Sequence, residues 1–314
     1  MKKNIYPFLV IFIIGTILVT ALPSCRKDKI ELTIKQYDAQ QIQTYMAAHG
    51  LTDFKRDTTG GDTSGIYYKI IIPGSGKPIQ YSDKLPFVYS EQTFDGKYAT
   101  TDTIGQHFYD FVGHLQLDGF PLGMQTAIHN LLIYPNASMR VLIPSHLAYG
   151  AAGKGSGSST VANNRIAGNQ CLDMYIRAVN QFGPYDNLVI QNYMKANNLT
   201  GYSMTKDSVY YKVETQGTGT DSIRSYSSFT STYTGQYLNG SIFDGAHNGS
   251  NSITYPIASF ATPGNAEVLE QSAVAGTLIS ILLPSKQAYG LNPPSGIPPF
   301  MCMRFSWQVI SVTP

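Results

Sequence analysis

The chain has 314 residues, a formal net charge of +2 and only 13% charged residues. This length suits about two domains, each large enough to bury a core of its own. No block of Lys or Arg lies outside the N-terminus, so no nucleic-acid partner is expected, and the 22 tyrosines are typical of β-rich domains.

The N-terminus has the pattern of an export signal. Met1-Lys2-Lys3 is positively charged, and residues 6–22 are almost wholly apolar. A charged start followed by a short apolar core and small residues indicates a signal peptide rather than a lasting membrane span.

Cys25 stands where cleavage of that signal would fall. Leu22-Pro23-Ser24-Cys25 resembles a bacterial lipobox, in the looser form of Bacteroidetes-type lipoproteins, whose Cys is lipidated and becomes the mature N-terminus. Each buried methylene of an acyl chain such as palmitate contributes roughly 0.8 kcal/mol, so several chains would hold firmly. The resemblance implies a signal peptide over 1–24, a tether over 25–36 and a membrane-anchored protein of the bacterial cell envelope, on the periplasmic side or the outer surface. An ordinary signal peptide with an incidental Cys is the alternative.

The rest of the chain repeats itself. VLIPSHLAYG (141–150) returns as ILLPSKQAYG (281–290), and Ile42–Met46 returns as Ile190–Met194 at an offset of 148 residues. Further matches keep the same order while the offset drifts, which predicts a tandem duplication of about 140–150 residues per unit. The two copies are expected at residues 37–180 and 181–314.

Each copy is expected to begin with a helix. In the first copy the apolar stripe at i, i+3, i+4 and i+7 consists of Ile42, Tyr45, Met46 and His49. Gly50 is expected to end this helix, and Asn187 is expected to cap the helix of the second copy.

Strands and one short helix follow in each copy. The expected strands are 66–72, 141–143 and 172–179 in the first copy, and 209–213, 229–237, 278–283 and 301–312 in the second. The expected short helices are 122–132 and 266–272, and the polar stretch 55–65 is expected to be a loop. Cys171 and Cys302 open the last strands of separate copies, so we expect both to be small apolar strand residues rather than a disulfide.

Five pieces of the second copy occur in a fixed order. They are YTG (233–235), GSIFDG (240–245), LPSKQAYG (283–290), GIPP (296–299) and a closing strand that contains Phe305. This order resembles the FKBP-type peptidyl-prolyl isomerase (rotamase) domain, over about residues 209–312 and more weakly over 66–179. The resemblance implies an α+β fold with two tandem FKBP-like domains, each a bent antiparallel sheet that wraps a short helix and is preceded by an N-terminal helix.

The resemblance also implies a site in the second copy. An apolar cup for a proline ring would have as its walls Tyr233, Phe243, Asp244, Ile297 and Phe305. Tyr289 would donate its hydroxyl to a substrate carbonyl. The family usually places a tryptophan at the base of this cup, but residues 262–266 are not aromatic and the only tryptophan, Trp307, lies in the last strand. The floor is therefore expected to be shallow or rebuilt.

The first copy departs further from the family pattern. Its counterpart pocket would consist of Tyr89, Phe120, Met124, Tyr149, Ile166 and Met174, with Phe120 or Met124 in place of the tryptophan. The Phe-Asp pair is missing, because Asp95-Gly96 falls on a turn. The long Gly/Ser-rich loop 151–164 could cover the pocket, so we expect a weak or inactive isomerase that can still bind chains.

Three functions remain open. The first is a lipid-anchored prolyl isomerase that assists the folding of exported proteins, acts on proline-containing polypeptides and needs no cofactor. The second is a non-catalytic peptide-binding or chaperone lipoprotein on the same fold, and the third is a carbohydrate-binding or adhesion lipoprotein with unrelated β domains. The six histidines show no metal-ligand spacing, so no metal is expected.

Overall fold

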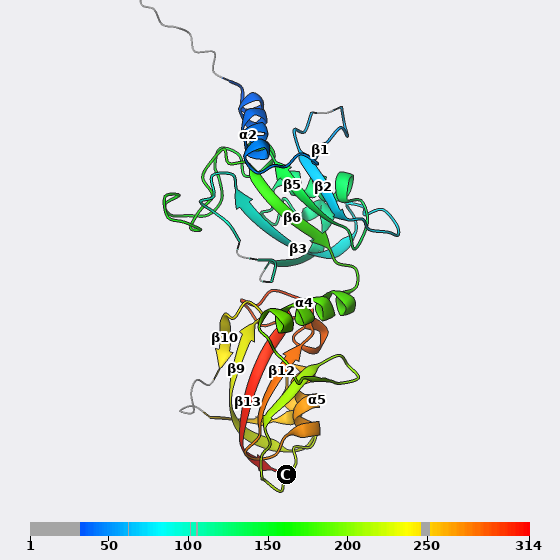
Figure 1. Cartoon of the computed structure of the whole chain (residues 1–314), viewed down its shortest axis with the longest axis vertical. Coiled ribbons are helices and arrows are strands. Elements are labelled where there is room, and N and C mark those ends of the chain that lie inside the picture. Colours follow the sequence, from blue (N-terminus) through cyan, green and yellow to red (C-terminus); the bar gives the residue numbers. More distant parts are fainter. Residues whose placement is uncertain (1–31, 62, 101, 105, 246–251) are drawn as a thin grey trace, which may run out of the picture. The chain divides into compact units, whose positions relative to one another are not determined.

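Figure 1 shows the computed structural model of the chain. The structure describes residues 32–61, 63–100, 102–104, 106–245 and 252–314. The expected signal peptide and Cys25 lie outside the described residues, so the lipid anchor stays a prediction. Within the described ranges, no helix has the length and hydropathy needed to cross a membrane.

The first copy is built on a six-stranded antiparallel sheet with strand order β1-β2-β5-β6-β3-β4. The strands are β1 (Lys55–Arg56), β2 (Tyr67–Ile72), β3 (Lys84–Thr93), β4 (His107–Phe111), β5 (Ser138–Ile143) and β6 (Leu172–Ala178). The helices are α2 (Ile34–Ala48) and α3 (Leu122–Ala127), and α3 continues into a wider turn at Ile128–Leu132. Short 3-10 helices cover Val112–His114 and Ser145–Leu147.

The second copy is built on a seven-stranded sheet with order β10-β9-β13-β12-β8-β7, and β11 also pairs with β9. The strands are β7 (Ser203–Met204), β8 (Tyr210–Thr215), β9 (Ser228–Tyr237), β10 (Ile242–Gly245), β11 (Ile253–Pro256), β12 (Leu278–Leu283) and β13 (Met303–Thr313). The helices are α4 (Phe182–Ala196) and α5 (Pro263–Ser272). Short 3-10 helices cover Ile257–Ser259 and Ser285–Gln287.

Alternation along the strands places each core. In β9 every second residue is buried, beginning at Phe229, and these side chains share one face because successive strand residues point to opposite sides. Val268 and Leu269 of α5 are fully buried in the same cluster. The corresponding cluster of the first copy contains Met124 of α3 and the apolar face of β5.

The expected α+β class, with a sheet and a short helix in each of two tandem units, is confirmed. Gly50 follows α2 with φ +62°, the left-handed conformation that ends helices. The expectation that Asn187 caps the second helix was wrong. Helix α4 begins at Phe182, after Gln181, so Asn187 lies within it, and the Asn187 side chain instead accepts a hydrogen bond from the Tyr210 hydroxyl.

Other expected elements are refined. The expected loop 55–65 contains the short strand β1, which pairs with β2. Helix α5 begins three residues earlier than expected, because Pro263 suits the first turn of a helix. Cys171 and Cys302 are both buried and free, as expected. The domain limits at 36/37 and 180/181 stay predictions.

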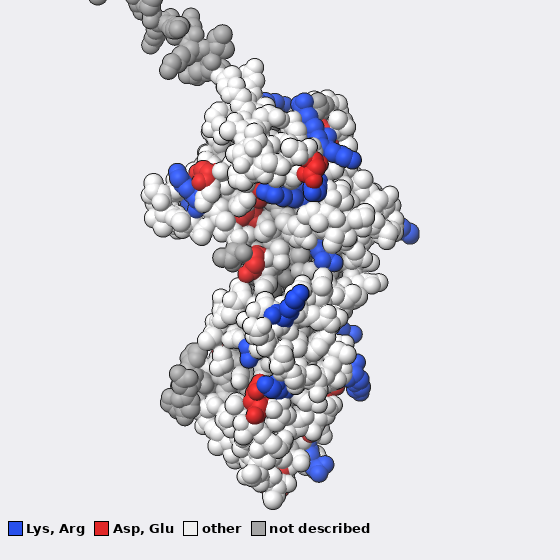
Figure 2. All heavy atoms as spheres, in the orientation of Figure 1, with Lys and Arg blue, Asp and Glu red and all other residues white. Residues whose placement is uncertain are grey.

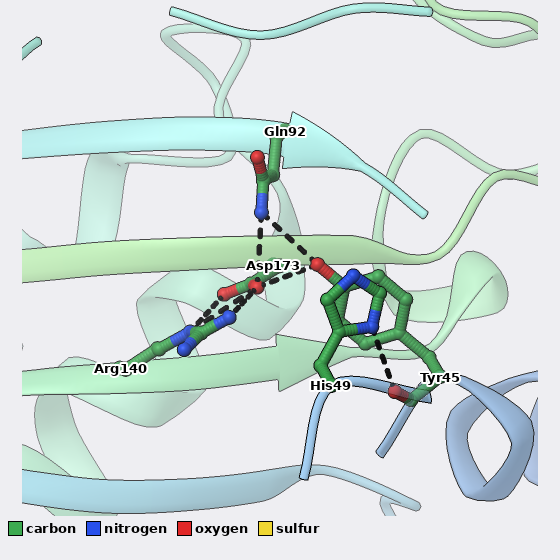
Figure 3. Close-up of polar contacts among 5 residues, drawn as sticks. All are labelled: Tyr45, His49, Gln92, Arg140 and Asp173. Atoms are coloured by element: carbon green, nitrogen blue, oxygen red, sulfur yellow. Dashed lines mark hydrogen bonds and ion pairs between the residues drawn. The ribbon is translucent and has the colours of Figure 1, made fainter. Parts of the chain in front are cut away.

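A polar cluster holds α2 against the sheet of the first copy (Figure 3). The Tyr45 hydroxyl donates to Asp173 Oδ2 at 2.9 Å, and Gln92 Nε2 donates to both, at 3.0 and 3.1 Å. Arg140 Nε donates to Asp173 Oδ1 at 2.9 Å, and the Tyr45 ring stacks on His49. Burial and the Asp173 charge raise the pKa of Tyr45 to about 12, so the hydroxyl stays a donor at neutral pH.

The second copy keeps this cluster with its charge reversed. Arg304 occupies the strand position of Asp173, and Ser280 occupies that of Arg140. Tyr193 of α4 now accepts hydrogen bonds, from Arg304 at 3.3 Å and from Gln236 at 3.4 Å. In each copy, therefore, a tyrosine hydroxyl of the preceding helix is hydrogen-bonded to the sheet. The helix is part of the folded unit in both copies.

Substituting Arg140→Gln should lower the free energy of unfolding by about 2 kcal/mol, because it leaves the Asp173 carboxylate buried without its cation. The expected loss is below that of a fully buried pair because the Arg140 side chain is 34% exposed. Urea unfolding followed by circular dichroism measures it. Ser280→Ala, the matched change in the second copy, should cost under about 1 kcal/mol. Equal losses in the two variants would contradict this account.

Candidate functional site

A cavity of about 160 Å³ lies where β9, β10, β11 and β13 meet the segment that leads into α5. It is lined by Tyr233, Asp244, Tyr255, Ser259, Phe260, Ala261, Thr262, Tyr289, Phe305 and Trp307. Six of these ten side chains are aromatic. Larger cavities of about 300 and 430 Å³ lie beside α2, but neither is lined by Tyr149 or Tyr289, the tyrosines of the two Ala-Tyr-Gly sequences.

Trp307 forms the inner wall of this cavity. Its indole ring is 2% exposed, stacks on Tyr233 at 4.5 Å between ring centres, and packs against Phe260 at 5.4 Å. The indole Nε1 donates to Asn265 Oδ1 on α5 at 3.2 Å. The sequence did not show which residue forms the floor of the cup. In the structure an aromatic ring of the last strand, β13, takes this place, and not a residue at the start of α5.

The sequence contained a signal for this position that the motif comparison passed over. Phe305, Trp307 and Val309 alternate along β13 and are all buried, so they share the inner face of the strand. Tyr255 and Ser259 were also missed. They follow residues 246–251, which separate them from the recognised Phe-Asp piece.

Asp244 stands at the mouth of the cavity. The Tyr233 hydroxyl donates to Asp244 Oδ2 at 2.7 Å, and Tyr255 approaches Tyr233 at 3.5 Å. The pairing of β10 with β9 is irregular between Ile242 and Asp244, just before this carboxylate. Burial first, and then these hydrogen bonds, raise the pKa of Tyr233, so its hydroxyl is a fixed donor.

Tyr289 presents the uncommitted polar group of the cavity. Among the described residues, no hydrogen-bond partner of its hydroxyl is found. Burial raises the pKa of Tyr289, and the nearby Asp244 carboxylate raises it further. The hydroxyl therefore keeps its proton at neutral pH and can donate to an acceptor that enters the cavity.

Phe243 and Ile297, the other two residues expected in the cup, support it from outside. Both pack against the core cluster, and the Phe243 ring meets Phe305 edge-on at 5.9 Å, but neither lines the cavity. Gly235 makes this contact of rings feasible. A Cβ atom at that position would lie 2.9 Å from Phe305 and 3.0 Å from Phe243.

The first copy has a glutamate where the second has this glycine. Glu91 pairs with Met174 across β3 and β6, as Gly235 pairs with Phe305 across β9 and β13. The Glu91 side chain is 1% exposed and receives Lys154 Nζ at 3.2 Å. The charged side chains of the first copy thus occupy the region that holds aromatic rings in the second.

Tyr149 of the first copy is fully engaged in this network. Its hydroxyl donates to Glu91 Oε2 at 2.9 Å and accepts from Lys154 Nζ at 2.9 Å. The Lys154 ammonium also lies 4.8 Å from the Tyr149 ring centre and 6.0 Å from that of Phe120. The tyrosine that is free in the second copy is therefore bound within the chain in the first.

The other residues expected in the first pocket divide into two groups. Phe120 meets Tyr89 edge-on at 5.2 Å and stands just before α3, the place expected for a replacement of the tryptophan. Met124, Ile166 and Met174 are at most 1% exposed and belong to the core. Phe94 stacks on Tyr45 of α2, and Asp95 binds the backbone of Lys97 in the turn, so neither joins the pocket.

No protein-family model matches the chain, and no curated protein matches it in sequence. Among solved structures, the chain is similar to the three FKBP domains of wheat FKBP73, at 15% identity and a TM-score of 0.32, over 83% of this chain and 99% of that one. It is also similar to FkpA from Escherichia coli, at 21% identity and a TM-score of 0.38, over 42% of this chain and 61% of that one. A third is a peptidyl-prolyl cis-trans isomerase from Pseudomonas syringae pv. tomato, at 21% identity and a TM-score of 0.36, over 42% of this chain and 96% of that one. FKBP domains and a peptidyl-prolyl isomerase are thus among the structures that this chain resembles.

Proposed function

We propose that the chain is a peptidyl-prolyl cis-trans isomerase whose second copy carries the activity. The observation that carries this proposal is the aromatic cavity of the second copy, which is lined by the uncommitted Tyr289, the Asp244 carboxylate and the Trp307 indole. The five-piece order of motifs in the same copy supports it.

The reaction needs no nucleophile. Rotation about an Xaa-Pro bond is opposed by amide resonance, with a barrier of about 18–20 kcal/mol. Water that donates hydrogen bonds to the substrate carbonyl strengthens this resonance, so a dry aromatic cup removes part of the barrier. Binding that favours the twisted amide over both planar forms accelerates the rotation in each direction.

Each group of the cavity has a place in this scheme. The rings of Trp307, Phe305 and Tyr233 would enclose the proline ring and exclude water. The Tyr289 hydroxyl would donate to a carbonyl of the substrate and fix the peptide on one side of the rotating bond. Asp244, held by Tyr233 at 2.7 Å, would orient the chain at the mouth of the cup.

The first copy would be a non-catalytic unit. Its Tyr149 hydroxyl and its pocket are taken up by Glu91 and Lys154, which favours a structural role for this half. A lipid anchor at Cys25 would place both copies at a membrane of the cell envelope, where exported polypeptides fold. On the face drawn in Figure 2, charged side chains are scattered among uncharged ones, as expected for a surface that meets polypeptides of varied charge.

Prolyl cis/trans exchange on a short Xaa-Pro peptide tests the proposal. The chain from Arg26 onward should accelerate exchange, and Tyr289→Phe and Asp244→Ala should each reduce kcat/KM by about 10–100-fold, since each removes a group that positions the peptide. Tyr149→Phe, the matched change in the first copy, should leave the rate unchanged. A folded chain that gives no acceleration would refute the enzyme and favour the peptide-binding alternative.

A further inference from the structure

A short chain of hydrogen bonds connects helix α4, which precedes the sheet of the second copy, to the backbone next to Tyr289. Asp186 of this helix is 1% exposed, and its Oδ2 accepts from Ser285 N at 2.8 Å and from Ser285 Oγ at 2.6 Å. Ser285 is the first residue of the 3-10 helix Ser285–Gln287, and Ala288-Tyr289-Gly290 follows this helix directly. The carboxylate therefore holds the first residue of the turn on which the candidate catalytic tyrosine depends.

Ser285 passes this restraint to both neighbours of Tyr289. The Ser285 carbonyl accepts from Ala288 N at 3.2 Å and from Gly290 N at 2.9 Å. The backbone on either side of Tyr289 is thus tied to a single peptide group. A carboxylate is a stronger acceptor than a neutral group, and its two charge-assisted bonds, from the backbone N and the hydroxyl of Ser285, fix the residue whose carbonyl holds the turn.

The first copy has a related arrangement, in which the aspartate binds the next residue of the turn. Asp38 of α2 is 1% exposed, and its Oδ2 accepts from His146 N at 3.2 Å and from the His146 ring at 2.7 Å. The Ser145 carbonyl again accepts from Ala148 N and Gly150 N, on both sides of Tyr149. In each copy, then, an aspartate of the preceding helix holds the tyrosine turn.

We infer that Asp186 is a positioning residue for the isomerase, which fixes the Tyr289 hydroxyl in the cavity through Ser285 and makes α4 part of the catalytic unit. The inference rests on the proposed function, because Tyr289 is assigned there as the donor to the substrate. It extends that function by a second property. The carboxylate can be neutralised by a proton, so the strength of its hydrogen bonds to Ser285 should depend on pH.

The surroundings of Asp186 set where this happens. Burial raises the pKa of Asp186 to about 6, while the hydrogen bonds from Ser285 oppose the shift. Cys302 is itself buried, and burial and the Asp186 charge raise its pKa, so it stays a neutral thiol. Lys286, the next residue of the turn, is exposed, and Tyr185 on the same helix is held neutral by burial, with its pKa raised to about 12.

The sign of the effect separates positioning from unfolding. The folded chain holds a proton on Asp186 more readily than the unfolded chain, so this group contributes more to the free energy of unfolding as pH falls from about 6 toward 4. Activity should change in the opposite direction, because the protonated carboxyl is a weaker acceptor for Ser285. Loss of activity near pH 6 without loss of stability therefore marks a positioning role.

The experiment compares the wild-type chain from Arg26 onward with Asp186→Asn, which mimics the protonated carboxyl. Wild-type kcat/KM should fall by about tenfold between pH 7.5 and pH 5, with a midpoint near 6, since a small misplacement of a donor costs this much. Asp186→Asn should be about tenfold slower at pH 7.5 and should show no such midpoint. Equal rates and equal pH profiles in the two proteins would overturn the inference.

One further variant separates the specific role from a structural one. Tyr193→Phe loosens the same helix at its other attachment, to Arg304 and Gln236, but leaves Ser285 held, so the rate should stay unchanged. A fall in rate with Tyr193→Phe that equals that of Asp186→Asn would reduce Asp186 to a structural residue.

A readout without turnover keeps this inference separate from the proposed function. The ring resonances of Tyr289, assigned by nuclear magnetic resonance, should shift between pH 7.5 and 5 with a midpoint near 6 in the wild type and not in Asp186→Asn. If the wild type shows this shift but no isomerisation, the proposed function fails and the coupling of Asp186 to Tyr289 stands. If the shift is absent, the coupling fails whatever the activity.

Discussion

Replacing Trp307 by isoleucine should reduce kcat/KM for prolyl isomerisation by about 100-fold or more. Isoleucine is the residue at the matched strand position of the first copy, because Ile176 pairs with Tyr89 as Trp307 pairs with Tyr233. The smaller side chain would leave a void beneath the proline ring and remove the surface on which Tyr233 stacks at 4.5 Å. Water could then reach the substrate carbonyl, and the resonance that opposes rotation would be restored.

The same substitution should cost about 3 kcal/mol of stability, as expected when a large buried aromatic side chain is truncated. Urea unfolding by circular dichroism measures this cost, and the rate is compared only under conditions where both proteins are folded. Trp307→Phe, which keeps an aromatic floor, should lose less than about tenfold in kcat/KM. A folded Trp307→Ile protein with the wild-type rate would show that the indole is not the floor of a catalytic cup.

Periodicity along the sequence was enough to predict most of the helices and strands, because the two copies repeat the helical and strand patterns in the same order. Ile42 and Ile190 lie on buried helix faces, and the strand alternation around Phe305 is realised in β13. These features depend on neighbouring residues only, so spacing along the chain was enough to predict them.

The floor of the site could not be predicted in this way, because it depends on which rings meet in space. The family pattern directed attention to the start of the short helix, near residues 262–266, whereas the ring comes from Trp307 of another element. The role of Glu91 was missed for a different reason. The match of Tyr89 with Tyr233 already places Glu91 at the position of Gly235, but only the structure shows that its carboxylate binds Lys154 and Tyr149.

The aspartate contacts were equally out of reach. Tyr-Asp recurs at the start of both preceding helices, but Asp186 and Ser285 are 99 residues apart in sequence. Nothing local indicates that this carboxylate holds the tyrosine turn. The recurrence of Tyr-Asp in both copies singles out Asp186, but only the structure shows that its carboxylate binds Ser285.

Lys154→Ala should destabilise the first copy by about 2–3 kcal/mol. The variant leaves the Glu91 carboxylate, whose side chain is 1% exposed, without its cation and with the Tyr149 hydroxyl as a donor. The expected loss lies below that of a fully enclosed pair because the Lys154 side chain is 37% exposed. Urea unfolding at pH 7.5 measures the loss.

The double variant Lys154→Met with Glu91→Gln should recover most of this loss, since it removes both charges and keeps the volume of the side chains. If it is as unstable as Lys154→Ala, the buried charge is not the cause.

A second double variant, Lys154→Ala with Glu91→Gly, recreates the situation of the second copy, in which a glycine faces the cup and the tyrosine hydroxyl is uncommitted. It should bind an Xaa-Pro peptide at the first copy, detected through the resonances of Tyr149 and Phe120, whereas the wild type should not. The low activity expected of the first copy would then follow from two charged side chains that fill its pocket and not from a failure of the fold. Absence of binding in a folded double variant would instead assign the difference to Met174 and Ile176, which replace the aromatic rings of β13.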